Sequence, residues 1–109
     1  MPIVHDLKWS DSEKKIARTV FQAAVSAELQ ETIADFKRRA VAVSAPEEMW
    51  ELEEYLRRRR TDIDRKYDYR YSQLIFVFGY LLREKRIGEA DLAGLSEDKL
   101  EGIRRVAAL

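Results

Sequence analysis

Glycine and proline are nearly absent from most of this chain. Neither residue occurs between Asp11 and Val43, or between Pro46 and Gly79. Because glycine and proline are the residues that most often end a helix, both stretches predict long helices. Four glycines and two prolines in 109 residues also leave little material for β-turns, so the sequence favours an all-α fold.

Two sequence patterns indicate where the long helices begin. Residues 10–13 (Ser-Asp-Ser-Glu) fit a capping box, in which the serine and glutamate side chains satisfy free amides of the first turn. Residues 44–47 (Ser-Ala-Pro-Glu) fit a second capping box with proline in the first turn. Only two or three residues then separate the helices, which predicts an antiparallel hairpin. We expect the second helix to bend or break near Asp64–Asp68.

Shorter helices are expected after that break. Residues 74–82 (Leu-Ile-Phe-Val-Phe-Gly-Tyr-Leu-Leu) are apolar nearly all round, which suits either a buried strand or a buried helix. The neighbouring helices and the lack of any partner strand favour the helix. We expect it to end at Gly88, followed by a short helical turn at residues 89–93 and a last helix from Ser96.

The first helix carries apolar residues on two different faces, displaced by more than a quarter of a turn. The two stripes are Ile16, Val20, Ala23 and Ala27, and Leu29, Ile33, Phe36 and Ala40. A helix that needs cover on two sides has two neighbours, and a second copy of the chain is the simplest supplier of the second one. We therefore expect a homodimer. Its predicted interface includes Met49, Leu52, Leu56 and Ile33.

Three regions follow from these predictions. Residues 1–10 are expected to form an N-terminal tail, and residues 11–67 a helical stalk hairpin that contains the dimerisation region. Residues 68–109 are expected to form a small helical head. No apolar run approaches the ~18 residues of a membrane span, and the N-terminus lacks the layout of a signal peptide, so a cytoplasmic protein is expected.

Composition argues against several classes of function. The 20 basic and 20 acidic residues balance, so the chain lacks the basic excess that nucleic acid or an acidic membrane attracts. It has no cysteine, and its one histidine, His5, lies in the tail without a nucleophile nearby. Phosphate-loop, dinucleotide-binding and Glu-x-x-His motifs are absent. We expect a protein that is not an enzyme and that holds no cofactor or metal.

The run Arg57–Arg60 has two interpretations. Glu53 and Glu54 each precede an arginine by four residues, which is the favourable order for ion pairs on a helix, so the run can be a solvated, salt-bridged face. It can also bind a protein partner, because tryptophan and arginine dominate interface hot spots and Trp50 lies off the main apolar stripe of this helix.

A long spaced pattern runs through the central part of the chain. It comprises residues 49–56 (Met-Trp-Glu-Leu-Glu-Glu-Tyr-Leu), Arg60, and residues 63–64, 66–68, 74–78 and 81–82. This pattern resembles the fluorescence recovery protein family of cyanobacteria, and the similarity extends from about Trp9 to Leu109. The resemblance implies an all-helical dimer with a stalk and a head.

The resemblance also implies a function. Members of this family bind the photoactivated orange carotenoid protein, help to detach it from the phycobilisome and speed its return to the inactive orange form. That return ends non-photochemical quenching, a photoprotection mechanism of the antenna. The family acts without covalent chemistry.

On the stalk, Trp50 and Arg60 match the family's functional patch. Glu54 replaces an aspartate there, which keeps the charge on a longer arm. Glu53 stands where cyanobacterial members often carry histidine, which reverses the local charge. The resemblance thus implies that these four residues contact the partner.

In the head, Phe76 matches a partner-contact position of the family. Gly102 occupies the place of a lysine that contributes to that contact, with Arg104 and Arg105 as possible substitutes. These departures leave a second interpretation open: a dimeric helical adaptor with the same scaffold, acting on an unknown protein partner in an organism that lacks phycobilisomes.

Overall fold

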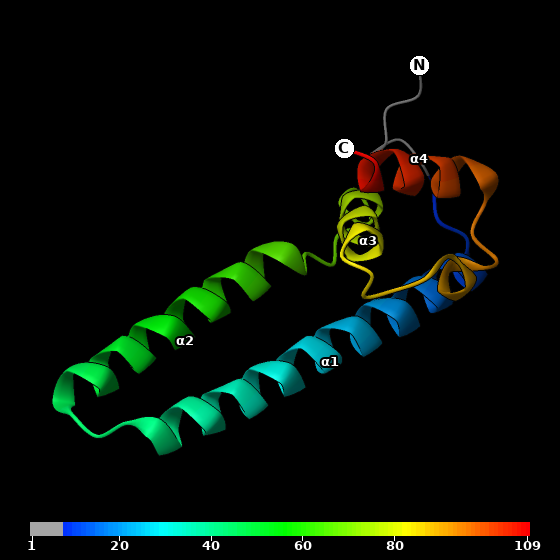
Figure 1. The fold of residues 1–109 in the computed structure, drawn as a ribbon. Helices are drawn as coiled ribbons and strands as arrows, with labels where there is room; N and C mark the ends of the chain where they lie inside the picture. The colour runs from blue at the N-terminus through cyan, green and yellow to red at the C-terminus, as the bar shows by residue number, and fades with distance from the viewer. Residues whose placement is uncertain (1–7) are drawn as a thin grey trace. The chain divides into compact units, whose positions relative to one another are not determined.

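The computed structural model describes residues 8–109, and the predicted all-α fold is confirmed. The elements are α1 (Asp11–Ala42), α2 (Pro46–Lys66), α3 (Leu74–Arg83), the 3-10 helix η2 (Glu89–Leu92) and α4 (Glu97–Ala107) (Figure 1). No strand occurs in this part of the chain, so residues 74–82 take the helical alternative. None of its helices combines the length and the apolar character that crossing a membrane requires.

The described chain forms two compact units. The head unit contains the residues up to Ala24 together with Tyr67–Leu109, and the hairpin unit contains Val25–Lys66. This division differs from the expected one, which assigned residues 11–24 to the stalk. The difference arises because the first half of α1 contributes apolar side chains to the core of the head. Those side chains are Ala17, Val20 and Ala24.

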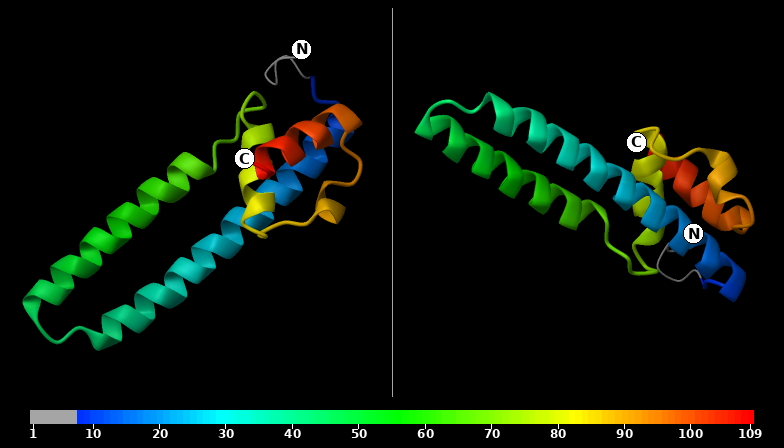
Figure 2. Two further views of the ribbon diagram at one scale, coloured as in Figure 1. Left: turned by 45° about the horizontal axis from the view of Figure 1, so that its top comes forward. Right: turned by 90° about the horizontal axis from the view of Figure 1, so that it is seen from below.

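The head unit is built on a close crossing of α3 and α4 (Figure 1, Figure 2). Gly79 lies at the crossing, where an added Cβ would be 2.4 Å from Cβ of Val106. A glycine is therefore required there, because any side chain would push the two helices apart. The largest fully buried side chains of the head unit are Phe78, Leu74, Ile75, Leu81, Leu92 and Ile103.

A residue other than glycine ends α3. Lys85 has a left-handed backbone with φ 63°. Its amide donates to the carbonyl of Leu82 at 3.1 Å, and the next amide donates to that of Leu81 at 2.9 Å. This is the Schellman pattern, whose left-handed position is usually glycine. The prediction that Gly88 ends the helix is wrong, since Gly88 has φ −112° and precedes η2.

The two predicted capping boxes have different outcomes. At α1, the Ser10 amide donates to Oε1 of Glu13 at 2.9 Å and the Glu13 amide donates to Oγ of Ser10 at 3.2 Å, as predicted. At α2, the Ser44 amide and hydroxyl donate to Oε1 of Glu48 rather than to Glu47. Because Pro46 is the first helical residue, the third is Glu48, and the prediction was one residue out of register.

Trp9, which was expected to lie in the N-terminal tail of residues 1–10, is part of the head's core. Trp9 is buried against the Tyr71 ring, with the ring centroids 5.8 Å apart. Nζ of Lys99 lies 5.1 Å from the Trp9 ring. The indole supplies a large apolar surface that the small head can bury. Residues 1–7 of the expected tail, including His5, lie outside the described residues.

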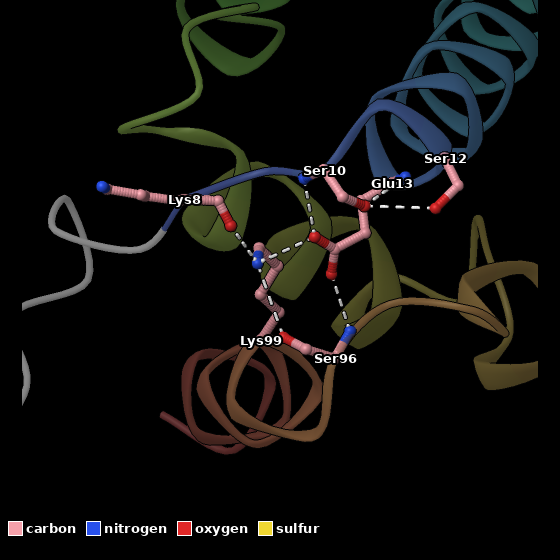
Figure 3. A network of polar contacts seen from close by, with 6 residues as sticks. All are labelled: Lys8, Ser10, Ser12, Glu13, Ser96 and Lys99. Carbon is pink, nitrogen blue, oxygen red and sulfur yellow. Dashed lines mark hydrogen bonds and ion pairs between the residues drawn. The ribbon is translucent and has the colours of Figure 1, made fainter.

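A buried ion pair joins the start of α1 to the start of α4 (Figure 3). Nζ of Lys99 lies 3.1 Å from Oε1 of Glu13 and also donates to the carbonyl of Lys8. Burial alone would raise the pKa of Glu13, but bonds from the Ser10 and Ser96 amides and from Lys99 lower it to about 2. The carboxylate is therefore charged in the folded head at neutral pH.

Tyrosines anchor the connection between α2 and α3. The predicted helix break is confirmed, since α2 ends at Lys66. The Tyr67 and Tyr69 ring centroids lie 5.5 and 4.8 Å from that of Phe21, and Tyr71 packs on Trp9. Alternate residues of this segment thus point into the head, as in an extended chain.

In the hairpin unit, α2 runs antiparallel to the second half of α1, and Val43–Ala45 joins them (Figure 1, Figure 2). The predicted hairpin is confirmed. Its inner face is largely polar, because Glu28, only 3% exposed, pairs with Arg59 at 3.2 Å and with Lys66 at 2.8 Å. Of the first predicted apolar stripe, Val20 is buried and Ile16 half-buried, whereas Ala23 and Ala27 are exposed in the single chain.

Candidate partner-binding surface

Trp50 projects from the outer side of α2 and is 61% exposed. Because α2 turns about 100° per residue, Trp50 lies on the side away from Leu52 and Ile63, which face α1 or its flank. An exposed indole does not stabilise the hairpin by burial. A tryptophan in this position is typical of a protein-binding surface.

The charged residues near Trp50 form ion pairs along α2. Arg57 lies 3.2 Å from Glu53 and 3.4 Å from Glu54, and Arg58 lies 3.2 Å from Glu54. These side chains are mostly exposed, so each pair contributes only about 0.3–0.5 kcal/mol to stability. The free hairpin therefore shows the solvated, salt-bridged face, with pairs weak enough to exchange for a partner's groups.

Arg60 is the least constrained of the predicted contact residues on α2. Its side chain is 87% exposed, and Nε lies 3.9 Å from Asp64. The structure thus places Trp50, Glu53, Glu54 and Arg60 on one continuous outer surface of a single helix. Phe76 and Arg104, the other two predicted contact residues, belong to the head unit.

In the head, Phe76 is half-buried and packs against the core. Arg104 is held by two carboxylates, since its guanidinium lies 2.9 Å from Glu89 and 3.1 Å from Glu97. Arg105 is less engaged, with 3.9 Å to its nearest carboxylate. Of the two arginines considered as substitutes for the family's lysine, Arg104 therefore needs to break more contacts to bind a partner.

Gly102 stands close to the neighbouring helix. An added Cβ would lie 3.1 Å from Cγ2 of Ile75, so a longer side chain requires a small shift of α3 or α4. Gly102 therefore allows a close packing of α4 on α3.

Apolar side chains line one flank of the hairpin unit. Leu29, Ile33 and Phe36 follow one another on α1 and stay partly exposed, and Met49 on α2 is 48% exposed. Glu28 on α1 and Arg59 on α2 mark the sides on which the two helices face each other. Counted along the chain at about 100° per residue, the apolar residues of both helices are rotated from these positions in the same direction about the helix axis. Because the helices are antiparallel, this direction leads to the same flank of the hairpin. Leu52 and Leu56, half-buried, continue the line on α2. We call this surface the apolar flank.

A groove of about 480 Å³ lies beside Trp50 in the hairpin unit. Its lining residues are Arg39, Trp50, Glu51, Glu54, Tyr55 and Arg58. The Arg39 guanidinium lies 4.0 Å from the Tyr55 ring centroid, and the Tyr55 hydroxyl donates to Asp35. Arg39 and Tyr55 were not among the predicted contact residues. The i,i+4 spacing of Asp35 and Arg39 was a signal for an ion pair, but not for its contact with α2.

The described residues offer little for metal or acid–base chemistry. Among residues 8–109, no three His, Cys, Asp or Glu side chains are grouped so that they could hold a metal ion. The carboxylate whose pKa shifts most, Glu13, is used in the structural pair with Lys99. The outer surface of α2 presents an exposed indole among exposed charged side chains.

Comparisons with known proteins agree on one group. The family described as photoprotection regulator fluorescence recovery protein matches residues 9–108. The chain is 35% identical over 101 residues to the fluorescence recovery protein of Synechocystis sp. (strain ATCC 27184 / PCC 6803 / Kazusa), which covers 93% of each chain. It matches the solved structure of the Fremyella diplosiphon fluorescence recovery protein with a TM-score of 0.88 and 38% identity, over 94% of this chain and 100% of that one. The solved Synechocystis structure matches with the same TM-score and coverage at 34% identity.

Proposed function

This chain belongs to the photoprotection regulator fluorescence recovery protein family, and from that premise we propose its function. It accelerates the return of the photoactivated orange carotenoid protein to its inactive form and its release from the phycobilisome, which ends non-photochemical quenching. The protein acts in the cytoplasm by binding, without a cofactor and without covalent chemistry. The family is one of regulators, in keeping with that mode of action.

The observation that carries the proposal is the exposed indole of Trp50 within the charged surface of α2. A protein that speeds a conformational change must bind the barrier state, or the product-like closed state, more tightly than the open state. A large aromatic surface next to exchangeable ion pairs supplies binding free energy that depends on the partner's shape. Glu53, Glu54 and Arg60 extend this surface.

We propose that the active form is a homodimer that buries the apolar flank. Met49, Leu52, Leu56 and Ile33 then lie in the interface. The apolar flank is exposed in the single chain, and burial of apolar surface stabilises by about 25 cal/mol per Å². A second copy can cover it isologously, because both copies carry the same flank.

The test compares variants in the dark reversion of a photoactivated orange carotenoid protein. Trp50→Ala should lower the binding free energy by about 2 kcal/mol, which is roughly 30-fold in the dissociation constant. At protein concentrations below that constant, the acceleration should fall by the same factor. Arg60→Ala should also reduce it. Arg65→Ala, which removes an exposed arginine from the same helix, serves as the matched control. Helical circular dichroism and molar mass should stay unchanged in all three.

Two outcomes would contradict the proposal in different ways. Wild-type protein in excess that leaves the reversion rate untouched would remove the orange carotenoid protein as the partner. A Trp50→Ala protein as active as the wild type would remove the α2 surface as the binding site.

A second candidate function is a dimeric adaptor for another protein, in an organism that lacks phycobilisomes. The observation that favours it is in the head. Gly102 packs closely on Ile75, and Arg104 is held by Glu89 and Glu97, so the cationic contact implied by the family is altered. Pull-down of a different partner that depends on Trp50, with no effect on the reversion rate, would establish this function instead.

A further inference from the structure

We propose that the groove beside Trp50 receives one bulky apolar side chain of the partner protein, and that Arg39 and Tyr55 belong to the binding site. This inference rests on the proposed partner-binding role of Trp50. It extends the site from α2 onto α1, since Arg39 is the groove residue that α1 supplies.

The part of the groove formed by Tyr55 and Arg39 is organised before any partner binds. The Tyr55 ring is half-buried, its hydroxyl donates to Asp35, and the Arg39 guanidinium covers the ring at 4.0 Å from the centroid. Nε of Arg39 donates to the same carboxylate at 3.0 Å. Side chains already held in place lose little conformational entropy on binding, which favours affinity.

The charges in the groove favour an apolar occupant. The lining contains two cations, Arg39 and Arg58, and two anions, Glu51 and Glu54, so its formal charges cancel. Each arginine already has a carboxylate, because Arg39 pairs with Asp35 and Arg58 with Glu54. An apolar occupant therefore leaves both pairs intact. What remains available is the aromatic and guanidinium surface, which packs well against apolar and aromatic side chains.

The groove also remains open when two copies pair through the apolar flank. On α2, Glu51, Tyr55 and Arg58 are rotated from the inner residue Arg59 in the direction opposite to Met49 and Leu56. The groove and the apolar flank are thus on opposite sides of the hairpin. A different protein, rather than the second copy, is the occupant that fits this position.

The experiment uses full-length protein and a photoactivated orange carotenoid protein as the probe, with the dissociation constant and the reversion rate both measured. Arg39→Ala should weaken binding about tenfold, because it removes one wall of the groove. Arg38→Ala is the matched control. Arg38 is 73% exposed and also pairs with Asp35, but it does not line the groove, so less than about a twofold change is expected.

Salt dependence separates an apolar occupant from a charged one. If an apolar side chain enters the groove, the ratio of the Arg39→Ala and wild-type dissociation constants should change less than about twofold between about 50 and about 300 mM salt. A ratio that falls toward one as salt rises would show that Arg39 contributes charge alone, and would overturn the apolar occupant.

The two tryptophans provide a direct readout of the groove. In protein labelled with 5-fluorotryptophan, Trp9 reports on the head core and Trp50 on the groove. Addition of the partner should shift the ¹⁹F signal of Trp50 in the wild type, and the shift should be smaller in Arg39→Ala at saturating partner. A merely structural effect of Arg39 on stability would not produce this difference at saturation.

The outcomes distinguish the inference from the function on which it rests. Wild-type protein that neither binds the probe nor speeds its reversion overturns the proposed function, and the groove proposal with it. Wild-type activity with Arg39→Ala equal to Arg38→Ala, in both affinity and Trp50 shift, overturns the groove proposal alone. Loss of binding in Arg39→Ala but not in Arg38→Ala, with the altered Trp50 shift, supports both.

Discussion

Different interactions stabilise the interior of the head unit and the interior of the hairpin unit. All six of the largest fully buried side chains lie in the head unit, whereas in the hairpin unit, all of whose residues are described, Ile63 is the one buried apolar side chain. Between the helices of the hairpin, Glu28 pairs with Arg59 and Lys66. Meanwhile the apolar flank, which includes Leu29 and Ile33, stays exposed.

This difference shows which unit depends on another molecule. A core of its own makes the stability of the head a property of the single chain. The hairpin leaves much of its apolar surface in water, and that surface stabilises it only when something covers it. Concentration of the protein should therefore matter for the hairpin and not for the head.

The largest expected effect is in the buried ion pair of the head. Glu13→Gln keeps the shape of the side chain but leaves the ammonium of Lys99 buried without a counter-charge, which should lower the free energy of unfolding by about 3–5 kcal/mol. Urea denaturation followed by Trp9 fluorescence, in a Trp50→Phe background, measures it. Glu53→Gln, which breaks an exposed pair in the hairpin, should change stability by less than about 0.5 kcal/mol.

The pH dependence provides the control for that prediction. The pKa of Glu13 is lowered from 4.5 to about 2 by folding, so its contribution is present above pH 4.5 and is lost as the pH falls toward 2. The stability difference between wild type and Glu13→Gln should shrink by about 3 kcal/mol across that window. A difference that stays constant with pH would show that the ionised form of Glu13 is not what stabilises the head.

A matched pair of isoleucines tests the role of concentration. Ile103 is fully buried in the head and Ile33 is 44% exposed on the hairpin. Ile103→Ala should lower the free energy of unfolding by about 2–5 kcal/mol at any protein concentration. Ile33→Ala should weaken dimerisation by about 1 kcal/mol, or roughly fivefold, which light scattering on serial dilution measures. An unchanged dimer mass at every dilution would place Ile33 outside the interface.

The smallest expected effect is a gain in the head. Lys85 has a left-handed backbone, which a residue with a Cβ adopts at a cost of about 1 kcal/mol. Lys85→Gly should therefore raise the free energy of unfolding by about 0.5–1 kcal/mol. Gly88→Ala is the comparison, because Gly88 has a negative φ and an added Cβ would meet nothing closer than 3.8 Å. A stabilised Gly88→Ala and a destabilised Lys85→Gly would contradict the assignment of the helix end.

Local chemistry made most of the fold predictable. The capping box of α1, the end of α2 and the helix over residues 74–82 each follow from neighbouring residues and the scarcity of glycine and proline. The ion pairs of Arg57 and Arg58 on α2 were predictable for the same reason, whereas the choice of Trp50 and Arg60 as partner contacts came from the family resemblance. The register of the capping box at α2 was less predictable. Glu47 and Glu48 are equally good acceptors until it is known that Pro46 is the first helical residue.

Contacts between distant residues were not predictable. Glu13 and Lys99 are 86 residues apart, and each alone is compatible with a solvated helix face. The same holds for Tyr55 and Asp35, which lie 20 residues apart and build the groove wall. The end of α3 was missed because glycine is the usual left-handed residue there, and Gly88 lies only three positions after Lys85.

The tyrosine-anchored connection between α2 and α3 has a practical consequence for protein engineering. A segment without helical structure is ordinarily where a linker, an epitope tag or a circular-permutation break is tolerated. Here the rings of Tyr67, Tyr69 and Tyr71 pack against Phe21, Trp9 or one another. Because successive side chains of an extended segment point to opposite sides, one inserted residue would turn an inward ring toward water. The joint at Val43–Ala45 has no aromatic anchor, but Ser44 caps α2 through Glu48, so an insertion belongs before Ser44.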